Sequence, residues 1–153
     1  NCVVDRDNVD TLEAHARFIV EHFASDTHEA IHQVIYSHPS SAWDSDHYAE
    51  KQVSLERVRP PLLAACKVLL DAGLTVSTGG SCGFPPCVVA DEPRLHMPSR
   101  SEDFATADLA GRDFAEPCEA CALRPTCLGV RREYLAQYGA RGLETVTSTP
   151  PMS

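Results

Sequence analysis

The feature that most constrains the fold is an alternation of short apolar runs with helical patterns across residues 1–78. The runs Asn1–Val4, Ala30–Tyr36 and Leu74–Thr78 have the length of β-strands. Between them, apolar residues recur at steps of three and four, which is the period of an amphipathic helix. The residues concerned are Val9, Leu12, Ala16, Ile19 and Phe23, and then Val58, Leu62, Ala65, Leu69 and Ala72. Strands that alternate with such helices predict an α/β fold with a parallel sheet covered by helices.

Three details of this region carry further predictions. The run Ala30–Tyr36 lacks clean alternation, which is typical of a parallel strand buried on both faces. The segment Ser37–Lys51 is predicted to be a loop. The helical pattern from Ser54 should end at Gly73 as its C-cap glycine, and the pair Pro60-Pro61 implies either a helix start near Arg59 or a kink.

From Gly79 onward the composition changes to glycine, proline and cysteine. We expect a short strand at Val88–Ala90, a second near Phe104, and a short helix that is stopped by Gly139. Val130, Tyr134 and Tyr138 would lie on one face of that helix. The sequence therefore predicts an α/β part at residues 1–78, a cysteine-rich lobe at residues 79–145 and a disordered tail at residues 146–153.

Three cysteines within ten residues are spaced C-x2-C-x5-C, at Cys118, Cys121 and Cys127, and Cys87 stands upstream after two prolines. A cluster of this kind in polar, proline-rich sequence is typical of metal ligation rather than of core packing. Four thiolates complete a tetrahedral zinc site or the corners of a 4Fe–4S cluster. Zinc sites usually use two close C-x2-C pairs, so one pair and two single cysteines favour iron–sulfur, with zinc as the alternative. Cys82 is a possible alternate ligand.

Other polar and thiol residues have simpler interpretations. Cys2 and Cys66 lie in apolar segments and are expected to be core thiols. His38 and His47 follow the second strand, at the end of a parallel sheet where ligands bind, but surface loop histidines are the preferred interpretation. Among basic residues near the cysteines, those that could offset the negative charge of a cluster are Arg124, Arg131 and Arg132.

Composition excludes several classes of function. The formal net charge of -9 argues against a nucleic-acid or anionic-membrane surface, and no apolar run has the length of a membrane span. Seven cysteines cannot all pair within one chain, which favours reduced thiols and a cytoplasmic location. Because the sequence opens directly into an apolar run at Asn1, we expect it to begin inside a longer protein.

Together these segments resemble the C-terminal part of a radical S-adenosylmethionine (SAM) enzyme. NCVVDRDNVDTLEAHARFIVEHF resembles the fifth strand and helix of that family's partial barrel, and IHQVIYSHPSSAW resembles the sixth strand and its loop. The stretch LTVSTGGSCGFPPCVV resembles the exit from the barrel. PCEACALRPTCLGVRREYLAQYG resembles the end of the auxiliary-cluster extension of the SPASM and twitch types.

The resemblance implies an auxiliary 4Fe–4S cluster held by four ligands, Cys87, Cys118, Cys121 and Cys127. The SPASM form has a further cysteine where this chain has Arg131, so the shorter twitch form with one cluster is implied. The family's SAM-cleaving C-x3-C-x2-C motif is absent from this sequence. SAM binding and catalysis are therefore expected to need the N-terminal part of the same protein, with a peptide or protein as substrate. The alternative is a zinc-stabilised binding module without catalytic activity.

Overall fold

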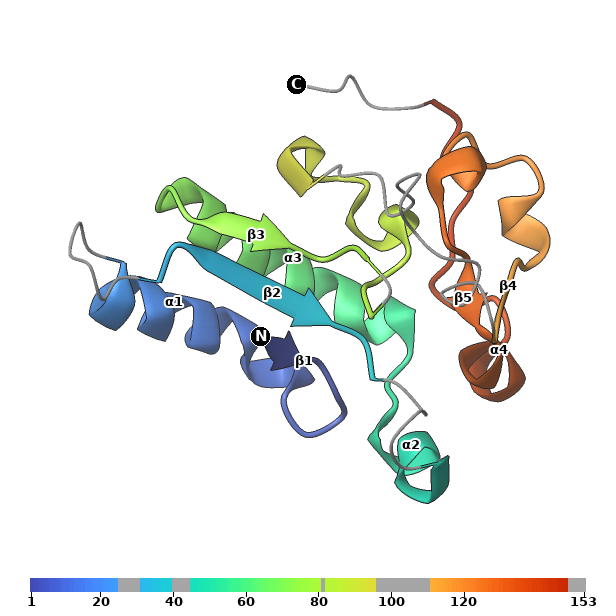
Figure 1. Cartoon of the computed structure of the whole chain (residues 1–153), viewed down its shortest axis with the longest axis horizontal. Coiled ribbons are helices and arrows are strands. Elements are labelled where there is room, and N and C mark those ends of the chain that lie inside the picture. Colours follow the sequence, from blue (N-terminus) through green and yellow to red (C-terminus); the bar gives the residue numbers. More distant parts are fainter. Residues whose placement is uncertain (25–30, 40–44, 81, 96–110, 149–153) are drawn as a thin grey trace.

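The computed structural model describes residues 1–24, 31–39, 45–80, 82–95 and 111–148. Their helices and strands follow one another as shown in Figure 1. The helices are α1 (Leu12–Phe23), α2 (Ser45–Lys51), α3 (Leu55–Asp71) and α4 (Arg132–Tyr138). The strands are β1 (Cys2–Val3), β2 (Gln33–Ser37), β3 (Thr75–Ser77), β4 (Arg112–Asp113) and β5 (Val130–Arg131).

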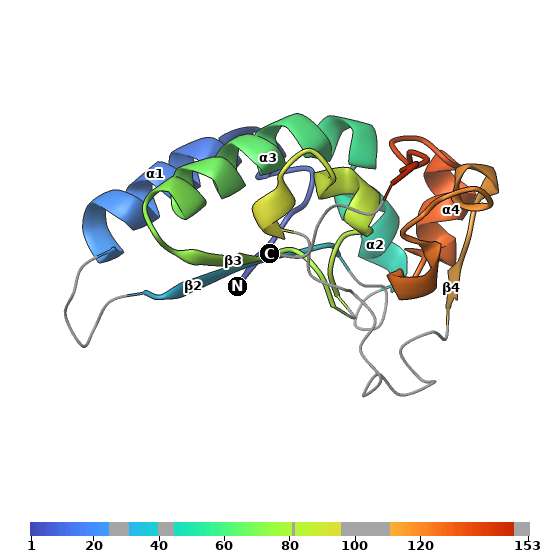
Figure 2. The same cartoon turned by 90° about the horizontal axis from the view of Figure 1, so that it is seen from above.

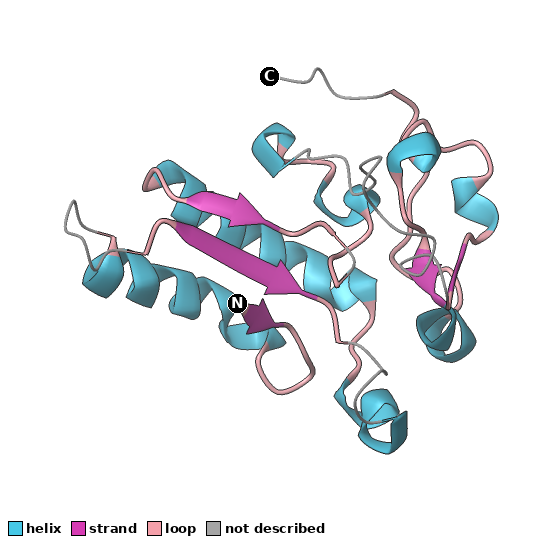
Figure 3. Cartoon of the chain, viewed as in Figure 1, coloured by secondary structure: helices cyan, strands magenta, loops and turns pink. Residues whose placement is uncertain are grey.

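The first three strands form a parallel sheet in the order β1-β2-β3. Cys2 lies opposite Tyr36, and Val34 lies opposite Val76. The expected α/β class with parallel strands is therefore confirmed. In the described part of the chain these strands form an open sheet and not a closed barrel (Figure 3).

Helices α1 and α3 pack against each other on the same face of the sheet (Figure 2). Alternate residues of β2 point to that face, where Val34 and Tyr36 are buried. Ile35, which points the other way, is 37% exposed, and Val3 of β1 is 46% exposed. The prediction that the second strand is buried on both faces is therefore wrong. Its apolar run Val34-Ile35-Tyr36 hides the alternation, because the exposed position is also apolar.

Helix α3 begins at Leu55 and carries both prolines in its interior. Ser54 caps it, because its hydroxyl accepts a hydrogen bond from the Arg57 N–H at 3.4 Å. A start near Arg59 is therefore wrong. Gly73 follows the helix with φ +81°, in the left-handed conformation expected of a C-cap glycine.

Three local predictions need correction. The segment predicted as a loop contains α2, a seven-residue helix that is too short to show a period and that buries Tyr48. Val88 belongs to a 3₁₀ turn, η2 (Pro86–Val89), and not to a strand, because the Val88 N–H donates to the Pro85 carbonyl at 3.0 Å. Val130 lies in β5, and the last helix starts only at Arg132. Gly139 does end that helix, with φ +59°.

Two further expectations concern the end of the chain and residues outside the described part. The predicted strand near Phe104 and residues 149–153 of the tail lie outside the described residues. Val146 falls within the predicted tail, yet its carbonyl accepts a hydrogen bond from the Ala122 N–H at 2.7 Å. The ordered chain therefore includes the beginning of that segment.

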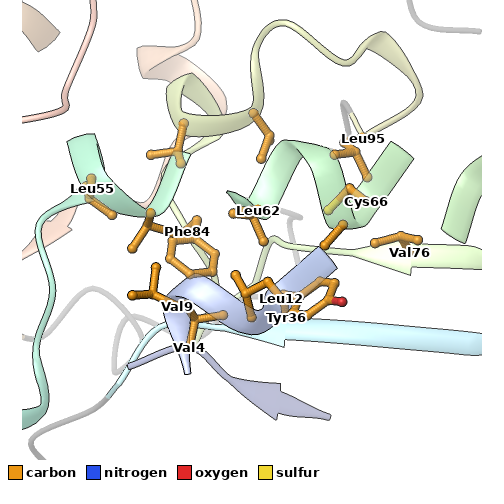
Figure 4. Close-up of a cluster of buried hydrophobic side chains, with 14 of the residues drawn as sticks. Val4, Val9, Leu12, Tyr36, Leu55, Leu62, Cys66, Val76, Phe84 and Leu95 are labelled. Carbon is orange, nitrogen blue, oxygen red and sulfur yellow. The ribbon is translucent and has the colours of Figure 1, made fainter. Parts of the chain in front are cut away.

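One hydrophobic core runs through the described elements (Figure 4). It includes Leu12 of α1 and Leu62 of α3, and also Tyr134 of α4. The Leu55 N–H donates to the Tyr134 hydroxyl at 2.8 Å, which ties the start of α3 to α4. The segments 1–78 and 79–145, expected as separate parts, thus share a core.

No helix among the described residues is long and apolar enough to cross a membrane.

Candidate metal centre

The four predicted ligands, Cys87, Cys118, Cys121 and Cys127, border one small pocket. Cys87 lies in the 3₁₀ turn η2, which packs against α3. The other three come from the loop between β4 and β5. Cysteines from two distant segments of the chain thus converge on one place in the structure.

Tight turns give the C-x2-C-x5-C block its shape. The Cys121 N–H donates to the Cys118 carbonyl at 3.3 Å, so the close pair spans a single turn. A second turn brings the chain back, because the Cys127 N–H donates to the Arg124 carbonyl at 3.3 Å. Pro117 and Pro125 stand in the first positions of the 3₁₀ turns Glu116–Cys118 and Arg124–Thr126, where a missing N–H is tolerated. Local sequence chemistry therefore explains why three thiols face one pocket.

The thiols influence one another electrostatically. Burial, and to a smaller extent the neighbouring thiols Cys127, Cys118 and Cys121, raise the pKa of Cys87 to about 11, although a backbone hydrogen bond at Glu144 lowers it. Burial likewise raises the pKa of Cys127, whereas the Gly129 N–H, which donates to its sulfur at 3.3 Å, lowers that pKa. At neutral pH, when no metal is bound, these two thiols are protonated. Metal binding would therefore release protons.

The arginines near the cysteine pocket differ in how close they lie to it. Arg124 borders it and stacks on the Phe114 ring, with its guanidinium carbon 5.0 Å from the ring centre. Arg132, which was expected to offset cluster charge, is exposed and faces Asp113 at 4.0 Å. Arg112, which the sequence did not single out, is buried, donates to the Gly129 carbonyl at 3.0 Å and lowers the pKa of Cys127.

The remaining cysteines lie away from this pocket. Cys66 is fully buried in the core, as expected, and Cys2 is only partly buried. Cys82, the possible alternate ligand, is exposed and borders a different cavity. The structure therefore does not bring Cys82 together with the other candidate ligands.

That second cavity, of about 550 Å³, lies at the carboxyl ends of β1 and β2, and both His38 and His47 border it. His47 is exposed, as a surface loop histidine should be. His38 is only 7% exposed, and its ring packs edge-on against Phe84 and Tyr134, at 5.5 and 5.7 Å between ring centres. The surface interpretation is therefore wrong for His38, because α4 and the turn before η2 close over it.

His38 predicts a measurable loss of stability in acid. Burial, together with Arg131 and Arg112, lowers its pKa to about 4. Below pH 6.5 the His38 ring binds a proton in the unfolded chain but stays neutral in the folded protein. The free energy of unfolding therefore falls by about 2 kcal/mol between pH 7 and pH 5. We expect urea unfolding to show this fall for wild type and to show it strongly reduced for His38→Gln. The exposed His32, replaced in the same way, is the control, and an unchanged pH dependence in His38→Gln would contradict the prediction.

Within the described ranges, no three His, Cys, Asp or Glu side chains are placed as ligands of one metal ion. The four thiols border a common pocket without the close approach of a mononuclear site. Comparisons with protein-family models, curated proteins and solved structures give no match. The function must therefore be argued from the residues themselves.

Proposed function

We propose that Cys87, Cys118, Cys121 and Cys127 hold a 4Fe–4S cluster, and that this chain carries the auxiliary cluster of a radical SAM enzyme. The observation that supports the proposal most is the convergence of all four thiols on one pocket. The choice of iron–sulfur over zinc rests on the C-x2-C-x5-C spacing and on the resemblance described above.

The donor set and its surroundings fit such a cluster. Four thiols are its usual ligands, and apolar side chains such as Leu123, Val130 and Leu143 enclose the pocket. The N–H of Gly129 already points to the Cys127 sulfur, and hydrogen bonds of this kind tune the potential of a cluster. Arg124 and Arg112 bring positive charge towards a centre whose four thiolates would be negative. When bound, the cluster would supply a one-electron redox centre.

The arrangement of the sheet supports the proposed partial barrel. In a β/α barrel the helices cover the outer face of parallel strands and the inner face turns to the interior. Here α1 and α3 cover one face, and Val3 and Ile35 are exposed on the other. The cavity at the carboxyl ends of β1 and β2 lies where barrel enzymes bind substrate. A peptide or protein substrate and SAM would meet there, with the SAM-cleaving cluster supplied by the N-terminal part of the same protein.

Anaerobic purification, followed by metal analysis and an absorption spectrum, tests the proposal. We expect about four irons and as many sulfides per chain, with a broad absorption band at about 400 nm. A colourless protein with stoichiometric zinc would instead establish the zinc-stabilised module. A folded protein without metal after iron and sulfide reconstitution would overturn both.

A further inference from the structure

The cavity at the carboxyl ends of β1 and β2, of about 550 Å³, has the volume of a small-molecule site. Most of its wall is apolar, and Val3, Pro39 and Tyr48 contribute to it. Val3 is 46% exposed, so its side chain is available to a ligand. In a site of this kind the apolar wall supplies contact area, and the few polar groups select the ligand.

Two polar side chains of the cavity already have partners within the chain. The Ser37 hydroxyl donates to the side-chain oxygen of Asn1 at 3.0 Å. The Lys51 ammonium donates to the Asp7 carboxylate and forms an ion pair with it. Both groups are therefore satisfied without a ligand.

Asp5, which also borders the cavity, uses only one of its two carboxylate oxygens. Its Oδ1 accepts the N–H of Asp7 at 2.9 Å and that of Asn8 at 3.2 Å, so the turn fixes the orientation of the carboxylate. In the part of the chain that the structure describes, its Oδ2 has no hydrogen-bond or ion-pair partner. An oriented carboxylate beside an apolar wall is complementary to an organic cation.

The charges around the cavity also favour a cation. The hydrogen bond and charge of Asp7 raise the pKa of Lys51, and the charges of Asp5 and Glu50 raise it to a smaller extent. Three carboxylates thus act on one ammonium group. Arg6, a further basic residue of this loop, does not border the cavity. The whole chain has a formal net charge of -9, and such a field attracts cationic ligands.

We propose that this cavity binds a primary ammonium group on an apolar stem, the chemistry of a lysine side chain in a peptide. The ammonium group would donate to Oδ2 of Asp5, and a hydrogen bond between two charged groups is stronger than one between neutral groups. The methylene stem would be buried against Val3 and Pro39. The site deepens the proposed function by naming the class of peptide, and only the identification of the ligand as a peptide rests on that function.

NMR titration of the ¹⁵N-labelled chain with two tripeptides tests the site. The first is acetyl-alanyl-lysyl-alanine amide, and the second carries norleucine, which has the same stem without the charge, in place of lysine. We expect saturable binding of the lysine peptide, with shifts at the amides of Asp5, Ser37 and Cys82, which border the cavity. The norleucine peptide should bind about tenfold more weakly, because the charged hydrogen bond is lost.

Three variants locate the binding group. Asp5→Asn should weaken binding of the lysine peptide about tenfold, because asparagine keeps the Oδ1 that holds the turn but carries no charge. Asp10→Asn is the matched control and should bind like wild type, since Asp10 is exposed, pairs with Arg57 and does not border the cavity. Lys51→Gln should bind about threefold more tightly, because a competing cation is removed. A general loss of structure would not produce this gain.

Each outcome decides the proposal. Absence of binding, equal binding of the two peptides, or equal affinities of Asp5→Asn and Asp10→Asn would overturn it. If n-butylamine binds as tightly as the lysine peptide, the ammonium site is supported and its ligand is a free amine. If Asp5→Asn does not fold, as judged by circular dichroism, the affinity of Lys51→Gln decides. Iron content is measured on the same samples: binding without iron overturns only the cluster, and full iron without binding overturns only this site.

Discussion

We expect Cys127→Ala to lose most of its bound iron, because a cluster with three protein thiolates lacks the fourth corner ligand. Cys127 also ends the last turn of the cysteine block, and its sulfur accepts the Gly129 N–H at 3.3 Å. Iron and sulfide analysis after anaerobic purification measures the loss. Cys66→Ala is the control, because Cys66 is buried in the core and does not border the pocket. It should keep full iron and cost about 1 kcal/mol of packing.

The same variant should show how far the cluster orders the surrounding chain. The sequence alone predicts that all of residues 79–145 would loosen while residues 1–78 stay folded. In the structure, however, the Tyr138 hydroxyl donates to the Gln52 carbonyl at 3.0 Å, and the Leu55 N–H donates to Tyr134. We therefore expect amide protection in Cys127→Ala to fall mainly in residues 111–129, while α4 stays protected. Full iron with native protection there would show that Cys127 is not a ligand.

The alternation of strands and helices was predictable because both patterns are local. The helical period correctly predicts that Leu12, Ala16 and Ile19 in α1, and Leu62, Ala65 and Leu69 in α3, are buried. It is wrong for Phe23 and Ala72 at the helix ends, which are exposed. The three cysteines of the block were predictable as a group for the same reason, since two short turns bring them together. Cys87 could be assigned only through its prolines and the resemblance, because nothing local links it to the block.

The features that sequence reasoning missed depend on contacts between distant segments. His38 looks like any loop histidine until Tyr134 and Phe84 pack against it. Arg112 is buried when β4 pairs with β5, where it donates to the Gly129 carbonyl. A single arginine or histidine in a polar stretch carries no periodic signal, so no rule based on spacing could have predicted that His38 and Arg112 are buried.

The contact between the C-terminal segment and α3 predicts a large effect for Gly142→Ala. Gly142 has φ +79°, and a methyl group there would lie 2.6 Å from the Leu55 carbonyl carbon and closer still to the Glu56 nitrogen. Both atoms belong to the backbone of the first turn of α3, which cannot move aside. We expect a loss of about 4 kcal/mol, from overpacking and from the left-handed backbone together. Urea unfolding measures it.

Gly73→Ala separates the two causes. Gly73 has nearly the same backbone conformation, φ +81°, but a methyl group there would meet nothing within 4 Å. It should therefore cost only about 1–2 kcal/mol, the penalty of the left-handed conformation. Gly142 also precedes Leu143 and Glu144, which both border the cysteine pocket, and Glu144 forms an ion pair with Arg59 of α3. Gly142→Ala should accordingly lower the iron content as well, whereas Gly73→Ala should leave it unchanged. Equal losses of stability in the two variants would show that the C-terminal segment does not lie against α3.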